Sequence, residues 1–132
     1  MIGALRDKAP VGQPEASNTI LLVEDEVLVR MMFADQLREA GYQVLEASNA
    51  DEALDLLRHS ASDVPVVISD VDMPGSMNGV GLARAIRTEC PLTKIVLVSG
   101  YQFSVDGVHH NGFFPKPYSA PAIITHVKAL LA

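Results

Sequence analysis

Short apolar runs alternate along this chain with longer segments whose apolar residues recur every three or four positions. Runs of this kind predict strands, and those that are apolar throughout predict strands buried on both faces. The expected strands are residues 19–23, 42–47, 64–69 and 94–99, with a short fifth at 112–114. The expected helices are residues 26–40, 48–60, 79–87 and 119–132. This alternation predicts an α/β fold, in which a parallel sheet is covered by helices on both faces.

Turn and capping residues support the helix boundaries. Gly41 follows the first helical segment, where a residue with positive φ often ends a helix. Asn49 and Glu52 have the spacing of a capping box. Asn78 and Ser119 each precede a helical segment and can accept hydrogen bonds from its first free N–H groups.

Length and charge limit the classes of protein to consider. The 132 residues are 48% hydrophobic, which suits one compact domain at 19–132 after a flexible leader at 1–18. The formal net charge is −6, and no run of Lys and Arg indicates a nucleic-acid surface. Because no apolar stretch approaches the ~20 residues of a membrane span and no signal pattern is visible, we expect a cytoplasmic protein that does not contact membranes.

Polar side chains follow four of the expected strands. In a parallel sheet the ligand site lies beyond the carboxyl ends of the strands, so these residues should converge at one edge. They are Glu24, Asp25, Asp70, Asp72, Ser99 and Lys116. Carboxylate oxygens suit Mg²⁺, and a carboxylate can also attack a phosphoryl group to form an acyl phosphate. A lysine and a hydroxyl can stabilise phosphoryl oxygens, so the set predicts phosphoryl chemistry.

Four motifs in order carry a resemblance to a known family. The segments ILLVEDE, VVISDVDMPG, VLVSG and FFPKPYS resemble the receiver domain of bacterial two-component response regulators, over about residues 18–132. The resemblance implies a flavodoxin-like doubly wound sheet of five parallel strands in the order 2-1-3-4-5. It also implies that the chain is a stand-alone receiver that signals by protein–protein interaction.

The resemblance implies a role for each motif residue. Asp70 would accept a phosphoryl group from a histidine kinase or a histidine phosphotransfer protein. Glu24, Asp25 and Asp70 would hold Mg²⁺ together with the backbone carbonyl of Asp72. Lys116 would pair first with Asp70 and then with the phosphoryl oxygens.

Two further residues would transmit the signal. By the resemblance, Ser99 would move to bind the phosphoryl group. Phe113 matches the aromatic position that rotates inward in similar receivers when that movement occurs. Such a protein would catalyse only its own phosphorylation and dephosphorylation, so it would not be an enzyme in the usual sense.

The chain departs from common receivers in two places. Lys116 follows Ser99 by 17 positions (116 − 99), about a helical turn fewer than usual, and residues 101–112 show no helical stripe. We therefore expect a fourth helix that is short or missing, and a partner-binding face that can switch by ordering. The loop MPGSMNG is also one residue longer than usual. Both features resemble receivers attached to hybrid histidine kinases.

Other functions remain open at this point. The two aspartates of DVDM resemble the DxDx(T/V) signature of haloacid-dehalogenase-like phosphatases. Met73 and Pro74 follow them in place of Thr or Val, and they come after the third strand, whereas that family has them after the first. A phosphate sink or relay without direct output is a second alternative. A receiver that signals by binding alone would lack the acceptor or the lysine, and both are present.

Overall fold

A computed structural model describes residues 17–60, 63–100, 105 and 107–132. Its centre is one five-stranded parallel sheet in the order β2-β1-β3-β4-β5. The strands are β1 (Thr19–Val23), β2 (Gln43–Ala47), β3 (Val66–Asp70), β4 (Lys94–Ser99) and β5 (Phe113–Pro115). The predicted strand order is confirmed.

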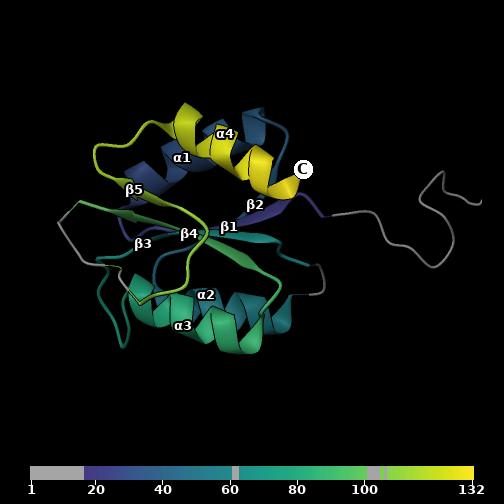
Figure 1. Ribbon diagram of the computed structural model, residues 1–132. Coiled ribbons are helices and arrows are strands. Elements are labelled where there is room, and N and C mark those ends of the chain that lie inside the picture. The colour runs from purple at the N-terminus through teal and green to yellow at the C-terminus, as the bar shows by residue number, and fades with distance from the viewer. Residues whose placement is uncertain (1–16, 61–62, 101–104, 106) are drawn as a thin grey trace, which may run out of the picture.

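Four helices cover the sheet in two layers. They are α1 (Val27–Glu39), α2 (Ala50–His59), α3 (Gly79–Glu89) and α4 (Ala120–Leu131). Figure 1 shows α1 and α4 on one face of the sheet and α2 and α3 on the other. The predicted α/β fold with helices on both faces is therefore confirmed.

The apolar runs are continuous because each face of the central strands packs against a helical layer. In β1, Ile20 and Leu22 belong to the core shared with α1 and α4, whereas Leu21 and Val23 belong to the core shared with α2 and α3. All four side chains are buried. Since successive side chains in a strand point to opposite faces, burial on both faces requires an apolar residue at every position.

Most predicted boundaries are within one or two residues of the observed ones. The third strand extends one residue further than predicted, because Asp70 still pairs with Val98 of β4. The fifth strand covers residues 113–115 in place of 112–114. The carbonyl of Gly112 nevertheless already accepts a hydrogen bond from the Leu97 N–H, so pairing with β4 begins at the predicted residue.

The predicted helix ends are formed by the expected residues, with one difference. Gly41 has a φ of 101° just after α1, and the Asn78 and Ser119 side chains cap α3 and α4. The side chain of Asn49 accepts a hydrogen bond from the Glu52 N–H, as in a capping box. The Glu52 carboxylate, however, accepts from the N–H of Ser48 at 2.6 Å, so the returning bond reaches one residue further back than predicted.

No helix occurs among the described residues between β4 and β5. Val105 and Val108 pack against the core on the α2–α3 face, and the Asn111 N–H donates to the Ile95 carbonyl at 2.7 Å. This part of the connection thus lies along β4, in agreement with the short or missing helix that was predicted. Residues 101–104 and 106, on which the rest of that expectation depends, lie outside the described part.

The expected leader, residues 1–18, falls almost wholly outside the described residues. Its last two residues are attached to the domain. The Ser17 hydroxyl donates to the Asp63 carbonyl, and the Asn18 amide donates to the Gly41 carbonyl. The strand β1 therefore begins from an anchored position.

Candidate functional site

The carboxyl edge of the sheet brings the predicted site residues together. Asp70 is the last residue of β3, Ser99 is the last residue of β4, and Glu24 directly follows β1. Ser99 pairs with Pro115 in the sheet register, so Lys116 is the first residue after the last pair of β4 and β5. The Lys116 N–H donates to the Ser99 carbonyl at 2.7 Å, which ties the end of β5 to the end of β4.

Three carboxylates and one ammonium form the centre of the site. One carboxylate oxygen each of Glu24, Asp25 and Asp70 lie within 4.8 Å of one another. The Nζ of Lys116 is 2.8 Å from Oδ2 of Asp70 and 3.7 Å from Oε1 of Glu24. Glu24 and Asp70 are only 5% and 6% exposed, whereas Asp25 is exposed. One lysine thus faces two buried carboxylates, and a third carboxylate opens to solvent.

Burial is the main cause of a perturbed pKa at Glu24. Burial raises the pKa of the Glu24 carboxyl from its ordinary 4.5 to about 7. The hydrogen bond from the Glu26 N–H and the charge of Lys116 lower this pKa, and the charge of Asp70 raises it. A cation bound beside these carboxylates would favour the ionised form of Glu24 and so oppose the effect of burial on its pKa.

The pKa values of Lys116 and Tyr118 are both raised by their surroundings. Burial lowers the pKa of Lys116, but its hydrogen bond to Asp70 and the charge of Glu24 outweigh burial, so this pKa is raised. Burial, followed by the charge of Glu24, raises the pKa of Tyr118. Lys116 therefore stays an ammonium at neutral pH, which is the form that can pair with phosphoryl oxygens.

The loop after β3 and the start of α3 contact Asp70, the candidate acceptor. The N–H of Asp72 donates to Oδ1 of Asp70 at 3.2 Å. At Gly79, the first residue of α3, a Cβ would lie 2.3 Å from the Asp70 carbonyl oxygen. Only glycine permits so close an approach of α3 to the end of β3.

The two residues expected to transmit the signal lie on the same face of the sheet. Ser99 is 1% exposed at the end of β4. Phe113 is half-buried on β5, where it pairs with Leu97 and packs against the α2–α3 core. Leu97 and Ser99 are two residues apart on one strand, so all three side chains point to that face. The movements expected of Ser99 and Phe113 stay predictions.

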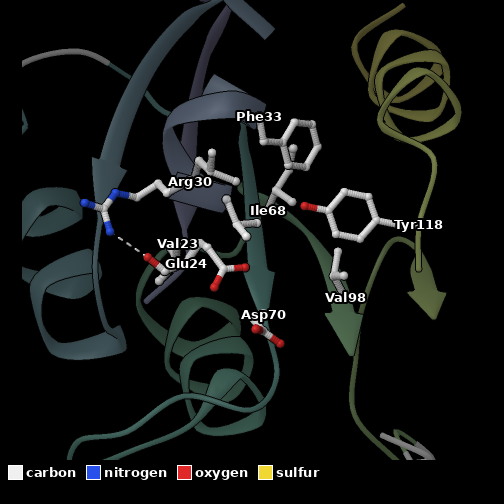
Figure 2. A pocket seen from close by; sticks show the side chains of 10 residues that line it. Val23, Glu24, Arg30, Phe33, Ile68, Asp70, Val98 and Tyr118 are labelled. Carbon is white, nitrogen blue, oxygen red and sulfur yellow. Dashed lines mark hydrogen bonds between the residues drawn. The ribbon is translucent and has the colours of Figure 1, made fainter. Parts of the chain in front are cut away.

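A small hollow borders the site on the α1 side. Its lining includes Glu24, Asp70, Arg30, Phe33 and Tyr118, and Figure 2 shows these side chains around the ends of β1 and β3. The rings of Phe33 and Tyr118 are 5.3 Å apart.

Two contributors to the site were not predicted from the sequence. Arg30 bonds the backbone of Glu24, and Gly79 permits the contact with Asp70. Arg30 lies in the first turns of the helix that follows the acidic motif, but its spacing alone does not indicate a bond back to a carbonyl. Gly79 carries no sequence signal beyond its place after a helix cap.

Comparison with known proteins assigns the class. The family model described as "Response regulator receiver domain" matches residues 20–128, and the chain therefore belongs to the response regulator receiver family. The earlier resemblance is thus confirmed.

The curated proteins that this chain resembles include a sensor kinase and several regulators. The chain is 39% identical to the sensor kinase CckA of Brucella abortus over 95% of its own length and 15% of that protein. It is 26% identical to the polar-differentiation response regulator DivK of Brucella anthropi, over 86% of this chain and 95% of DivK. The chain spans only 48% and 46% of two other curated relatives. The predicted likeness to hybrid-kinase receivers is confirmed by the 38% identity to the receiver domain of the hybrid histidine kinase CckA.

Solved structures agree with this assignment. The receiver domain of the hybrid histidine kinase CckA is 38% identical, with a TM-score of 0.73 over 86% of this chain and 99% of that one. The response regulator TrrA of Thermotoga maritima, solved in complex with Mg²⁺–BeF, is 30% identical, with a TM-score of 0.77 over 86% and 99% of the two chains. The trio of acidic residues is typical of the magnesium site of receivers.

Among the described residues, no helix is both long and apolar enough to cross a membrane.

Proposed function

We propose that this chain is a phosphoacceptor receiver in which Asp70 takes a phosphoryl group from a phosphohistidine of a histidine kinase or a phosphotransfer protein. The observation that carries the proposal is the 2.8 Å contact between Lys116 Nζ and Asp70 Oδ2 beside the acidic trio. A buried carboxylate paired with an ammonium at a strand end is a suitable nucleophile for phosphoryl transfer.

The reaction requires little from the protein beyond placement and charge. A carboxylate oxygen of Asp70 attacks the phosphorus, the bond from phosphorus to the donor imidazole nitrogen breaks, and the imidazole leaves with a proton from solvent. Lys116 already lies beside the attacked carboxylate and can follow the negative charge onto the phosphoryl oxygens. Ser99 at the end of β4 offers a hydroxyl at the same edge.

The residues present fit Mg²⁺. Oxygens of Glu24, Asp25 and Asp70 meet within 4.8 Å, and Mg²⁺ takes hard oxygen ligands and keeps several waters. The backbone carbonyl of Asp72 would complete the set of protein ligands. When bound, Mg²⁺ would neutralise charge on the transferring phosphoryl group. The relative TrrA, whose structure contains Mg²⁺–BeF, supports this choice of cation.

An exposed apolar surface supports signalling through protein partners. The first two turns of α1 expose Val27, Leu28, Met31 and Met32, which are 50–73% accessible. We call these four residues the α1 patch. It begins two residues after Asp25, so a protein that delivers a phosphoryl group to Asp70 could cover it. The similarity to the sensor kinase CckA supports a kinase as that protein.

Phosphotransfer from a panel of phosphorylated kinases and phosphotransfer proteins tests the proposal. We expect one labelled phosphoryl group per chain in the wild type with Mg²⁺, and no label in Asp70→Asn. Label retained by Asp70→Asn would refute the acceptor. Sustained turnover of a phosphate monoester would instead favour the phosphatase alternative. Passage of the label to a second phosphotransfer protein would identify a relay, and rapid loss with no bound partner would identify a sink.

A further inference from the structure

Arg30 on α1 is bonded to the backbone of the acidic motif. Its Nη1 donates to the Glu24 carbonyl at 2.8 Å, and its Nε donates to Oε1 of Glu46 on β2 at 3.3 Å. Only 16% of the side chain is exposed. Figure 2 shows the guanidinium on the side of Glu24 that faces away from Asp70. Arg30 therefore touches the peptide that carries Glu24 and Asp25, and not the carboxylates themselves.

Every polar group of Glu24 is held by a different element. Its N–H donates to the Ala47 carbonyl of β2, and its carboxylate accepts from the Glu26 N–H at 3.0 Å. Its carbonyl accepts from Arg30, which is the contact that links this turn to α1. The carbonyl follows the end of β1, whose last paired residue in the described part of the chain is Val23. Loss of Arg30 would leave it without a protein donor among the described residues.

We propose that Arg30 is a positioning residue that sets the affinity of the acidic trio for Mg²⁺ through the Glu24–Asp25 peptide. This inference rests on the proposed function. The forked guanidinium can bond a carbonyl and a carboxylate at once, whereas a lysine ammonium is a point charge on a flexible stem. Groups that orient ligands from behind commonly change metal affinity by roughly 10–100-fold when they are removed.

A charge effect would act in the opposite direction. A cation near the site repels Mg²⁺, so removal of Arg30 would tighten binding if charge alone mattered. Glu46 balances part of the Arg30 charge at 3.3 Å, although it also pairs with Arg38 at 3.1 Å, and Arg38 lies 4.0 Å from a second carboxylate, that of Asp35. We therefore expect the loss of orientation to exceed the gain from charge.

Arg38 provides a matched control. It lies on the same helix and donates to the other carboxylate oxygen of Glu46 and to the Val44 carbonyl, so its hydrogen bonds reach β2 and not the Glu24 carbonyl. The test is a titration of Mg²⁺ into the full chain, with Kd measured for the wild type, Arg30→Met, Arg30→Lys, Arg38→Met and Asp25→Asn. Phosphotransfer is measured in parallel at saturating Mg²⁺.

The expected result is a Kd raised roughly tenfold in both Arg30 variants, with phosphotransfer restored at saturating Mg²⁺ and Arg38→Met within twofold of the wild type. An unchanged Kd in Arg30→Met, or a wild-type Kd in Arg30→Lys, would overturn the inference. An equal loss in Arg38→Met would also overturn it, because general helix charge would then explain the effect. If Asp25→Asn binds as the wild type does, the proposed metal site itself fails, and the Arg30 inference fails with it. If only Asp25→Asn weakens binding, the metal site stands and Arg30 alone is excluded.

Discussion

At the scale of single residues, Glu24 dominates the electrostatics of the site. Its carboxyl is buried beside Asp70, and burial raises its pKa from 4.5 to about 7. An unfolded chain would ionise this group above pH 4.5, whereas the native state keeps it protonated until about pH 7. The native state therefore binds more protons in this window, so the free energy of unfolding falls as pH rises through it.

This linkage gives a prediction for Glu24→Gln. Without divalent cations, the contribution of Glu24 to the free energy of unfolding is fully present below pH 4.5 and is lost as the pH rises to about 7. A shift of this size corresponds to about 3 kcal/mol. Urea unfolding at pH 5 and pH 8 should show that the wild type loses more stability than Glu24→Gln over this interval. Glu26→Gln is the control, since Glu26 is an exposed neighbour. Parallel pH profiles for wild type and Glu24→Gln would contradict the raised pKa.

At the scale of elements, α1 combines a buried and an exposed apolar face. Phe33, Ala34 and Leu37 pack into the core with α4, while the α1 patch stays accessible. The sequence shows apolar residues on nearly every side of the first turns, and such a pattern does not reveal which side is buried. Apolar side chains left exposed together beside the site are better explained by a partner than by stability.

We predict that Leu28→Ser with Met32→Ser lowers the kcat/KM of phosphotransfer by about tenfold or more while stability changes by less than about 0.5 kcal/mol. The direction follows because a few residues near the centre of an interface carry most of its binding energy and can cost more than 1 kcal/mol each when truncated, whereas exposed substitutions scarcely affect folding. Quenched time courses with a cognate phosphodonor measure the rate of phosphotransfer, and thermal unfolding measures the stability of each variant. Leu92→Ser is the control, because Leu92 is 93% exposed and lies between α3 and β4, at the amino ends of the strands and so away from the site. Equal losses in the two variants would count against the α1 patch as the docking surface.

At the scale of the whole molecule, the period of the apolar pattern was enough to predict a parallel sheet with helices on both faces, since both faces of β1, β3 and β4 must be covered, whereas the strand order came from the family resemblance. The edge residues Glu24, Asp70 and Lys116 could be predicted to converge because parallel strands share one carboxyl edge. The contacts that Arg30 and Gly79 make with neighbouring elements could not be predicted. The Arg30 bond depends on the angle between α1 and β2, and the Gly79 contact depends on how closely α3 approaches β3. The connection between β4 and β5 could be predicted only as irregular, because it lacks a period.

The same edge couples the site to the stability of the whole domain. Above about pH 7, where Glu24 is ionised, two buried carboxylates share one lysine, so the folded chain carries uncompensated negative charge that the unfolded chain disperses. Mg²⁺ binds the folded state and should raise the melting temperature, with a gain of about 1.4 kcal/mol at ten times Kd and a shift of a few degrees. Calorimetric scans with and without Mg²⁺ measure this shift. Asp25→Asn should abolish the shift, whereas Glu26→Gln, which alters the next residue along the turn, should retain it. A melting temperature that Mg²⁺ leaves unchanged in the wild type would refute the metal site, because a ligand that binds only the folded state must stabilise it.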